Sequence, residues 1–140
     1  MDHLAEAKQL FLEALALQEK GDLEQAERFY KEALALAPER PSVMNNLATV
    51  YFGLKRYAEA KLLCVRLLEI DPEDAVALLH LGNCQVKLNS AEEALISYER
   101  ALEIRPDYAD ALTNRGNDLL ELKRPEEALA SPDRALAIKT

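Results

Sequence analysis

The sequence contains no tryptophan, four glycines and two cysteines among its 140 residues. The cysteines, Cys64 and Cys84, form no CxxC pair, which excludes a disulfide-dense scaffold and a thiolate metal site of that type. No stretch approaches the roughly 18 consecutive apolar residues of a membrane-spanning helix. The N-terminus, Met1–Glu6, lacks the basic start and apolar core of a secretion signal. These absences predict a cytoplasmic protein with no membrane partner.

Basic residues are also scarce, with 17 Lys and Arg against 25 Asp and Glu, for a formal net charge of −8. Nucleic acids and anionic membranes attract clustered basic side chains, so neither is an expected partner. The chain has two histidines, no Gly-rich phosphate loop and no HExxH motif. We therefore expect no enzyme activity, no metal and no cofactor. The acidic pairs Glu92–Glu93 and Glu126–Glu127 are expected on the solvated surface.

What the sequence does contain is an internal repeat. Pro38, Pro72 and Pro106 stand 34 residues apart, and the rest of the chain follows the same period. A fixed period of this length is typical of stacked helical units, and such solenoids usually act by presenting a surface. We expect residues 1–140 to form a single domain of four copies, the last incomplete, at 7–40, 41–74, 75–108 and 109–140.

Each copy predicts an antiparallel pair of helices, because apolar residues recur at steps of three and four. Gly21 is placed to end one helix, and Asp22 to cap the next. The spacer prolines stop each second helix. The expected first helices are Leu4–Glu19, Ser42–Gly53, Ala75–Leu88 and Ala109–Leu122. The expected second helices are Leu23–Leu36, Tyr57–Ile70, Ala91–Ile104 and Pro125–Ile138.

Small residues recur at fixed places in the copies, where they would let two helix axes approach closely. They are Ala14, Ala48, Gly82 and Gly116 in the first helices, and Ala26, Ala60, Ala94 and Ala128 in the second. Large core side chains share a second-helix position at Tyr30, Cys64 and Tyr98. This pattern resembles the tetratricopeptide repeat (TPR) over the whole chain from Ala7. The resemblance implies an all-α, right-handed superhelix of antiparallel helix pairs whose first helices line a concave face.

We predict that this concave face binds a peptide or a helical segment of a partner protein. Asparagine recurs on it, and an amide can donate to and accept from the backbone of an extended peptide. The row resembles the asparagine ladder in the TPR region of bacterial O-linked N-acetylglucosamine transferase-like proteins, with His80 replacing one asparagine. Alternatively, the amides bond neighbouring helices, and Phe52 and Leu79 belong to the core. The candidate groove residues are Asn45, Asn46, Thr49, Phe52, Leu79, His80, Asn83, Asn114 and Asn117.

Other uses of the same architecture lead to different expectations. Some TPR domains clamp the C-terminal carboxylates of heat-shock chaperones with Lys and Asn at fixed groove positions. Phe11, Leu15, Val76 and His80 occupy four of those positions here, and only Asn46 matches, so a chaperone co-factor is not expected. RNA binding of the pentatricopeptide kind fits poorly with a net charge of −8. The open alternatives are an accessory region of a larger enzyme, such as a glycosyltransferase, and a self-assembling scaffold.

The last copy departs from the pattern at Pro132, which occupies the position of Tyr30 and Tyr98. A proline inside a helix removes a backbone hydrogen bond and costs about 3 kcal/mol. We predict a kink or break over Ala130–Pro132, which leaves either a frayed helix or a segment that docks elsewhere. No polar capping helix follows before Thr140, so apolar surface is expected at this end. The chain is then either a fragment of a longer array or self-associates there.

Overall fold

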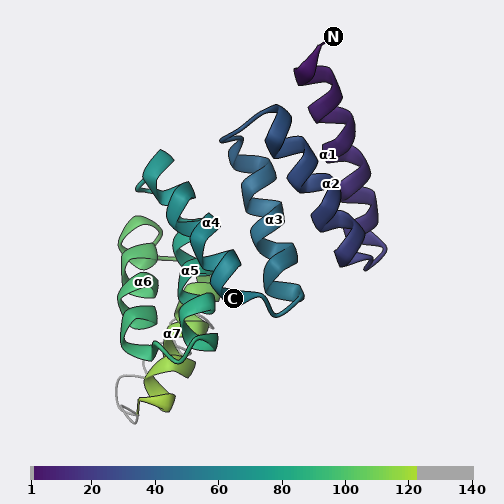
Figure 1. Ribbon diagram of the computed structural model, residues 1–140. Coiled ribbons are helices and arrows are strands. Elements are labelled where there is room, and N and C mark those ends of the chain that lie inside the picture. The colour runs from purple at the N-terminus through teal and green to yellow at the C-terminus, as the bar shows by residue number, and fades with distance from the viewer. Residues whose placement is uncertain (1, 123–140) are drawn as a thin grey trace. The chain divides into compact units, whose positions relative to one another are not determined.

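Seven α-helices and no strands make up residues 2–122, which this computed structural model describes (Figure 1). They are α1 (His3–Glu19), α2 (Leu23–Leu36), α3 (Pro41–Gly53), α4 (Tyr57–Ile70), α5 (Ala75–Lys87), α6 (Ala91–Ile104) and α7 (Ala109–Glu121). Each helix begins and ends within one residue of the bounds that the repeat predicts. The expected helix Pro125–Ile138 and the predicted break at Pro132 lie outside the described residues.

The chain forms two compact units, and the boundary falls inside α4 between Leu67 and Leu68. In unit 1, α1 packs against α2 and α2 against α3; in unit 2, α5 packs against α6 and α6 against α7. Consecutive helices within a unit run in alternate directions (Figure 1). The all-α class and the helix-pair arrangement expected from the repeat are confirmed.

The first helix of each of the first three copies ends in the same left-handed turn. Gly21, Lys55 and Asn89, at equivalent positions, have φ angles of 85°, 62° and 63°. In each turn the next N–H donates to a carbonyl five residues earlier, as from Asp22 to Leu17 at 2.9 Å. This is the hydrogen-bond pattern of a Schellman motif. Glycine adopts it without strain, whereas the Cβ atoms of Lys55 and Asn89 are crowded there.

Side-chain caps and a proline set the starts of α2, α3 and α5. The Asp22 carboxylate accepts a hydrogen bond from the Gln25 N–H at 3.3 Å, which confirms the predicted cap. Asp74 accepts from the Ala77 N–H at 3.0 Å and caps α5 in the same way. Pro41 is the first residue of α3, where its missing N–H leaves no helical bond unmade.

Close helix crossings depend on the small residues that the repeat predicts. In unit 1, Ala14, Ala26 and Tyr30 are fully buried. In unit 2, a core of six residues joins three helices, and one of them, Tyr98, packs against Gly82. A Cβ added to Gly82 would stand 2.5 Å from the Tyr98 Cε1 atom, a distance that real Cβ atoms do not tolerate. Glycine is therefore what allows the Tyr98 ring to rest on the α5 backbone.

Candidate functional site

Three side chains of unit 2, which we call the amide network, connect three helices. The Tyr98 hydroxyl on α6 donates to Asn83 Oδ1 on α5 at 2.7 Å, and Asn114 Nδ2 on α7 donates to the same oxygen at 2.9 Å. Burial raises the pKa of Tyr98 far above its ordinary value, so the phenol stays protonated and keeps donating. These bonds orient both amides, while Asn83 Nδ2 and Asn114 Oδ1 make no hydrogen bond among the described residues.

The other predicted residues of unit 2 differ in exposure. Asn117 is exposed and lies three residues after Asn114, so the two share one side of α7. His80 is half-buried, and burial lowers the pKa of its imidazole although nearby Asp74 opposes the shift. A neutral imidazole can donate from one nitrogen and accept at the other. Leu79 is 5% exposed and packs in the core of unit 2, which fits the alternative interpretation of this residue.

Unit 1 holds an arrangement equivalent to the amide network. The Tyr30 hydroxyl on α2 donates to Gln18 Oε1 on α1 at 2.5 Å. Burial raises the pKa of Tyr30, and the half-buried Asn46 on α3 offsets part of that rise. Asn46 and Asn114 are equivalent in the repeat, as are Tyr30 and Tyr98. In both units, therefore, the hydroxyl of this tyrosine donates to a side-chain amide on the first helix of its own copy.

The remaining candidates of unit 1 lie along α3. Thr49 is exposed, and its hydroxyl donates to the backbone carbonyl of Asn45 at 3.1 Å. Phe52 is half-buried and stands edge-on to Tyr57, with ring centroids 5.1 Å apart. Asn45 is half-buried on the same helix. These residues offer a mixed polar and aromatic strip, in which the Thr49 side chain is the most accessible part.

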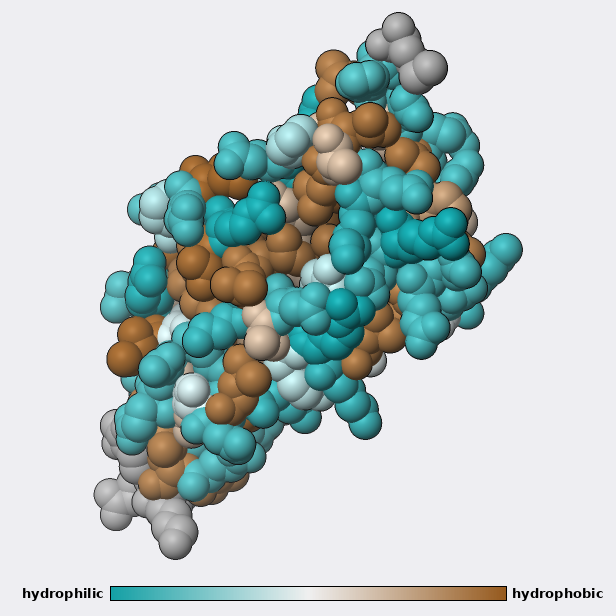
Figure 2. All heavy atoms as spheres, in the orientation of Figure 1, coloured by the Kyte–Doolittle hydropathy of each residue, from teal (hydrophilic) through white to brown (hydrophobic). Residues whose placement is uncertain are grey.

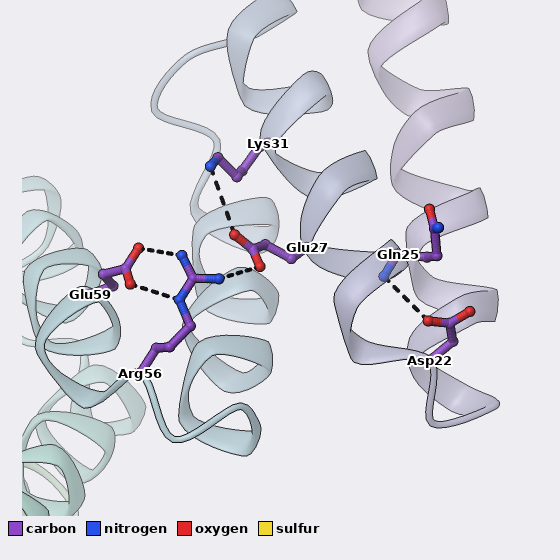
Figure 3. Close-up of polar contacts among 6 residues, drawn as sticks. All are labelled: Asp22, Gln25, Glu27, Lys31, Arg56 and Glu59. Atoms are coloured by element: carbon purple, nitrogen blue, oxygen red, sulfur yellow. Dashed lines mark hydrogen bonds and ion pairs between the residues drawn. The ribbon is translucent and has the colours of Figure 1, made fainter.

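A charged cluster centred on Arg56 was not foreseen from the sequence (Figure 3). The guanidinium donates to both oxygens of Glu59, at 2.7 and 2.8 Å, and to Glu27 on α2 at 2.5 Å. Lys31 lies 3.7 Å from Glu27, and the guanidinium lies 4.8 Å from the centre of the Tyr51 ring. The hydrogen bond from Arg56 lowers the pKa of Glu59. The Arg56–Glu59 pair could be predicted from its three-residue spacing. The bond to Glu27 could not, because Glu27 is 29 residues away from Arg56.

A second residue that sequence reasoning missed is Asp118 on α7. It is 2% exposed, and neither of its carboxylate oxygens has a hydrogen-bond partner among the described residues. Burial raises its pKa to about 6, and the carboxylates of Glu121 and Glu92 add to the rise. The repeat places Asp118 where Val50 and Cys84 stand in earlier copies, both buried. Aligning the copies at this position would have indicated a carboxylate at a core site.

Residues 2–122 also bear on disulfide, membrane-spanning and metal sites. Cys64 and Cys84 are both buried, and the structure records both as thiols. None of the helices described is long and apolar enough to span a membrane. No group of three or more His, Cys, Asp or Glu side chains within this range is arranged to hold a metal ion.

Comparison with known families gives a consistent match. Three family models described as tetratricopeptide repeat match residues 7–40, 39–107 and 85–140, and together they span residues 7–140. No curated protein sequence matches this one.

Solved structures with a similar fold include two kinds of protein. MamA from Desulfovibrio magneticus RS-1 superposes with a TM-score of 0.90 at 18% identity, over 95% of this chain and 75% of that one. MamA MSR-1 gives 0.83 at 22% identity, over 95% and 76%. The first TPR of Spaghetti (RPAP3), solved bound to the HSP90 peptide SRMEEVD, gives 0.81 at 25% identity, over 86% and 95%. The likeness to MamA shows the fold alone.

Proposed function

The chain belongs to the tetratricopeptide-repeat family, and on that premise we propose that it is a non-catalytic interaction module. It binds an extended or helical segment of a partner protein on the face formed by its first helices. The observation that carries this proposal is the amide network. Tyr98 holds Asn83 in place and Asn83 in turn holds Asn114, and each asparagine keeps one hydrogen-bonding atom without a partner among the described residues.

The chemistry of these atoms suits a peptide backbone. Asn83 Nδ2 is a donor and Asn114 Oδ1 is an acceptor, and a peptide unit presents one carbonyl and one N–H. Because the amides are already oriented, binding costs little side-chain entropy. Asn117 and the neutral His80 extend the same polar strip along α7 and α5. The partner would be recognised mainly by its main chain, so its side-chain sequence is only loosely specified.

The RPAP3 structure supports peptide binding by this architecture, yet the same peptide is not the expected ligand here. SRMEEVD ends in carboxylates, which a clamp of Lys and Asn side chains would bind through charge. Phe11, Leu15 and Val76 stand at three of the clamp positions in this chain, and none of them carries a charge. We expect SRMEEVD to bind at least tenfold more weakly than peptides selected on this chain.

The test is a selection of displayed disordered peptides on the full chain, followed by affinity measurement with three variants. Asn117→Ala removes an exposed amide without disturbing the amide network, and we expect a three- to tenfold loss of affinity. The double variant Asn83→Ala, Asn114→Ala is expected to lose binding more than tenfold. Glu103→Ala, an exposed change on α6, is the matched control and should bind as the parent does.

Circular dichroism and thermal melting accompany these affinities, because Asn83 also bonds Tyr98. If Asn117→Ala and the double variant bind every selected peptide as tightly as the parent, the amides serve only the fold. If Glu103→Ala loses binding to the same extent as Asn117→Ala, the binding surface is not the first-helix face. Tight binding of SRMEEVD would contradict the argument from the clamp positions.

Two other uses of the chain follow from specific features. The amide row favours an accessory region of a larger enzyme, such as a glycosyltransferase. Sequencing the coding region on either side of residues 1–140 tests this use, which requires a catalytic domain to be encoded there.

The exposed Leu120 on α7, with 56% of its surface accessible, favours self-assembly. Sedimentation over a hundredfold concentration range, with Leu120→Gln as the variant, tests that use. The buried thiols fit a reducing, cytoplasmic setting, which a fractionation experiment would check.

A further inference from the structure

A cavity of about 440 Å³ opens between α2 and α4 of unit 1, on the side of the second helices. Leu47 and Tyr51 of α3 form its base, and both are nearly fully buried. Leu62 stands at its edge with 65% of its surface exposed. Apolar side chains gather on the surface over α4 in Figure 2. None of the predicted groove residues lines this cavity, so it is separate from the face proposed above.

The lining is apolar at the base and charged at the edge. Leu34, Ala35, Pro38, Leu47, Tyr51, Leu62 and Leu63 supply the apolar part, and Lys31, Glu59 and Arg66 supply the charges. Covering apolar surface of this kind removes it from water, which is favourable. A cavity with an exposed leucine at its edge is therefore suited to receive an apolar side chain from outside.

The charge available at the edge is positive, although the whole chain carries −8. Arg56 bonds both oxygens of Glu59 and one of Glu27, and Lys31 lies 3.7 Å from the other oxygen of Glu27, so two cations here face two carboxylates (Figure 3). Lys31 is exposed over 57% of its side chain, and Arg66 is exposed. Arg66 makes no ion pair with a described residue. Arg66 is therefore the surplus cation at the edge, and together with the exposed part of Lys31 it complements a negatively charged ligand.

The repeat shows that this combination is particular to the first copy. Position 31 is Lys here, whereas the next two copies have Val65 and Glu99. Position 35 is the small Ala35, whereas the next two copies have Glu69 and Glu103. A glutamate at that place would fill space and repel an anion. Sequence divergence has thus left the first copy with both a small residue at the lining and a cation at the edge.

We propose that this cavity binds an acidic amphipathic segment of a partner protein. An apolar side chain of the segment enters between α2 and α4 against Leu47 and Tyr51. Carboxylates of neighbouring residues in the segment pair with Lys31 and Arg66. Helix-in-groove recognition combines these two elements, apolar anchors and charged flanks. The chain then presents two binding faces, one on its first helices and one on its second.

The experiment is a selection from displayed twelve-residue segments with two fixed leucines and all other positions drawn from Glu, Lys, Ser and Ala. The full chain is the target, and Leu62→Asp is used only afterwards, in the affinity measurements. Ile96→Asp is the matched control, because Ile96 is the equivalent residue of the next copy and is 61% exposed. We expect Glu to be enriched over Lys at least fivefold beside the leucines. Selected segments should bind Leu62→Asp at least tenfold more weakly than they bind the parent chain. Their affinity for Ile96→Asp should differ from that for the parent by less than twofold.

Charge reversal supplies a second readout that does not depend on the apolar contact. Arg66→Glu should reduce the enrichment of Glu over Lys to below twofold, while circular dichroism stays that of the parent. Enrichment of Lys, equal enrichment of both, or equal losses in Leu62→Asp and Ile96→Asp would overturn the proposal. So would segments displaced by peptides that require Asn117, which would place them on the first-helix face. If no segment is enriched and Leu62→Asp abolishes an oligomer seen by sedimentation, the occupant is a second copy and the proposal is wrong.

Discussion

Replacing Asp118 by valine should stabilise the protein, and the stabilisation should depend on pH. The carboxylate is 2% exposed and has no hydrogen-bond partner among the described residues, and its pKa rises from 3.8 to about 6. A rise of about 2 units corresponds to about 3 kcal/mol of lost stability once the group is ionised. Valine, the residue of the second copy at this position, removes that loss, and its helix propensity is close to that of aspartate. We expect a net gain of about 3 kcal/mol at pH 7.5.

The sign of the pH dependence follows from the direction of the shift. The folded chain holds this proton more tightly than the unfolded chain, so the parent is relatively stable near pH 4. It loses that stability as the pH rises to about 6. The difference between Asp118→Val and the parent should therefore be small at pH 4 and reach its full size above pH 7.

Urea unfolding at pH 4, 5, 6 and 7.5 measures this difference, and hydrogen exchange of α7 amides locates it. Thr113→Val, an exposed change on the same helix, is the control and should stay within about 0.5 kcal/mol of the parent at every pH. A gain for Asp118→Val that is the same at pH 4 and pH 7.5 would refute the ionisation argument. No gain at any pH would mean that the carboxylate is solvated or bonded in solution.

Three further substitutions test the packing and the turns. Gly82→Ala should cost about 1–3 kcal/mol in urea unfolding, because its Cβ would overlap the Tyr98 ring; an unchanged midpoint would show that the α5–α6 crossing relaxes freely. Lys55→Gly should stabilise by about 1 kcal/mol, because φ is 62° there; a loss of stability would contradict the left-handed conformation. Ser97→Ala should cost about 1–3 kcal/mol, since the buried Gln85 loses the hydroxyl that donates to it at 2.6 Å; a Tm within a degree of the parent would count against that bond.

Much of the fold could be predicted because its determinants are local and repeated. Gly21 and Asp22 mark a helix end and a helix start by their own conformational and capping preferences. The repeat period then predicts the equivalent turns in the other copies, even where Lys55 and Asn89 stand in place of glycine. Helix bounds agree within one residue for this reason.

The site was harder to predict, because its geometry depends on side chains that meet across helices. The sequence indicated which residues share a face, but not that Asn83 accepts hydrogen bonds from both Tyr98 and Asn114. The sequence could not decide whether Leu79 belongs to the binding face or to the core. Its position on the first helix lies between the side that faces the core and the side that faces a ligand. The burial of Asp118 could be predicted only by comparing the copies of the repeat.

The Arg56 cluster also has a consequence for how the array unfolds. It joins Glu27 of the first copy to Arg56 and Glu59 of the second, so it contributes to the interface between neighbouring repeats. In a linear array, interface energy decides whether adjacent repeats unfold as one block or one at a time. Charged contacts near the surface weaken as ionic strength rises. The cooperativity of the first two repeats is therefore adjustable by salt, with no change in the sequence or the fold.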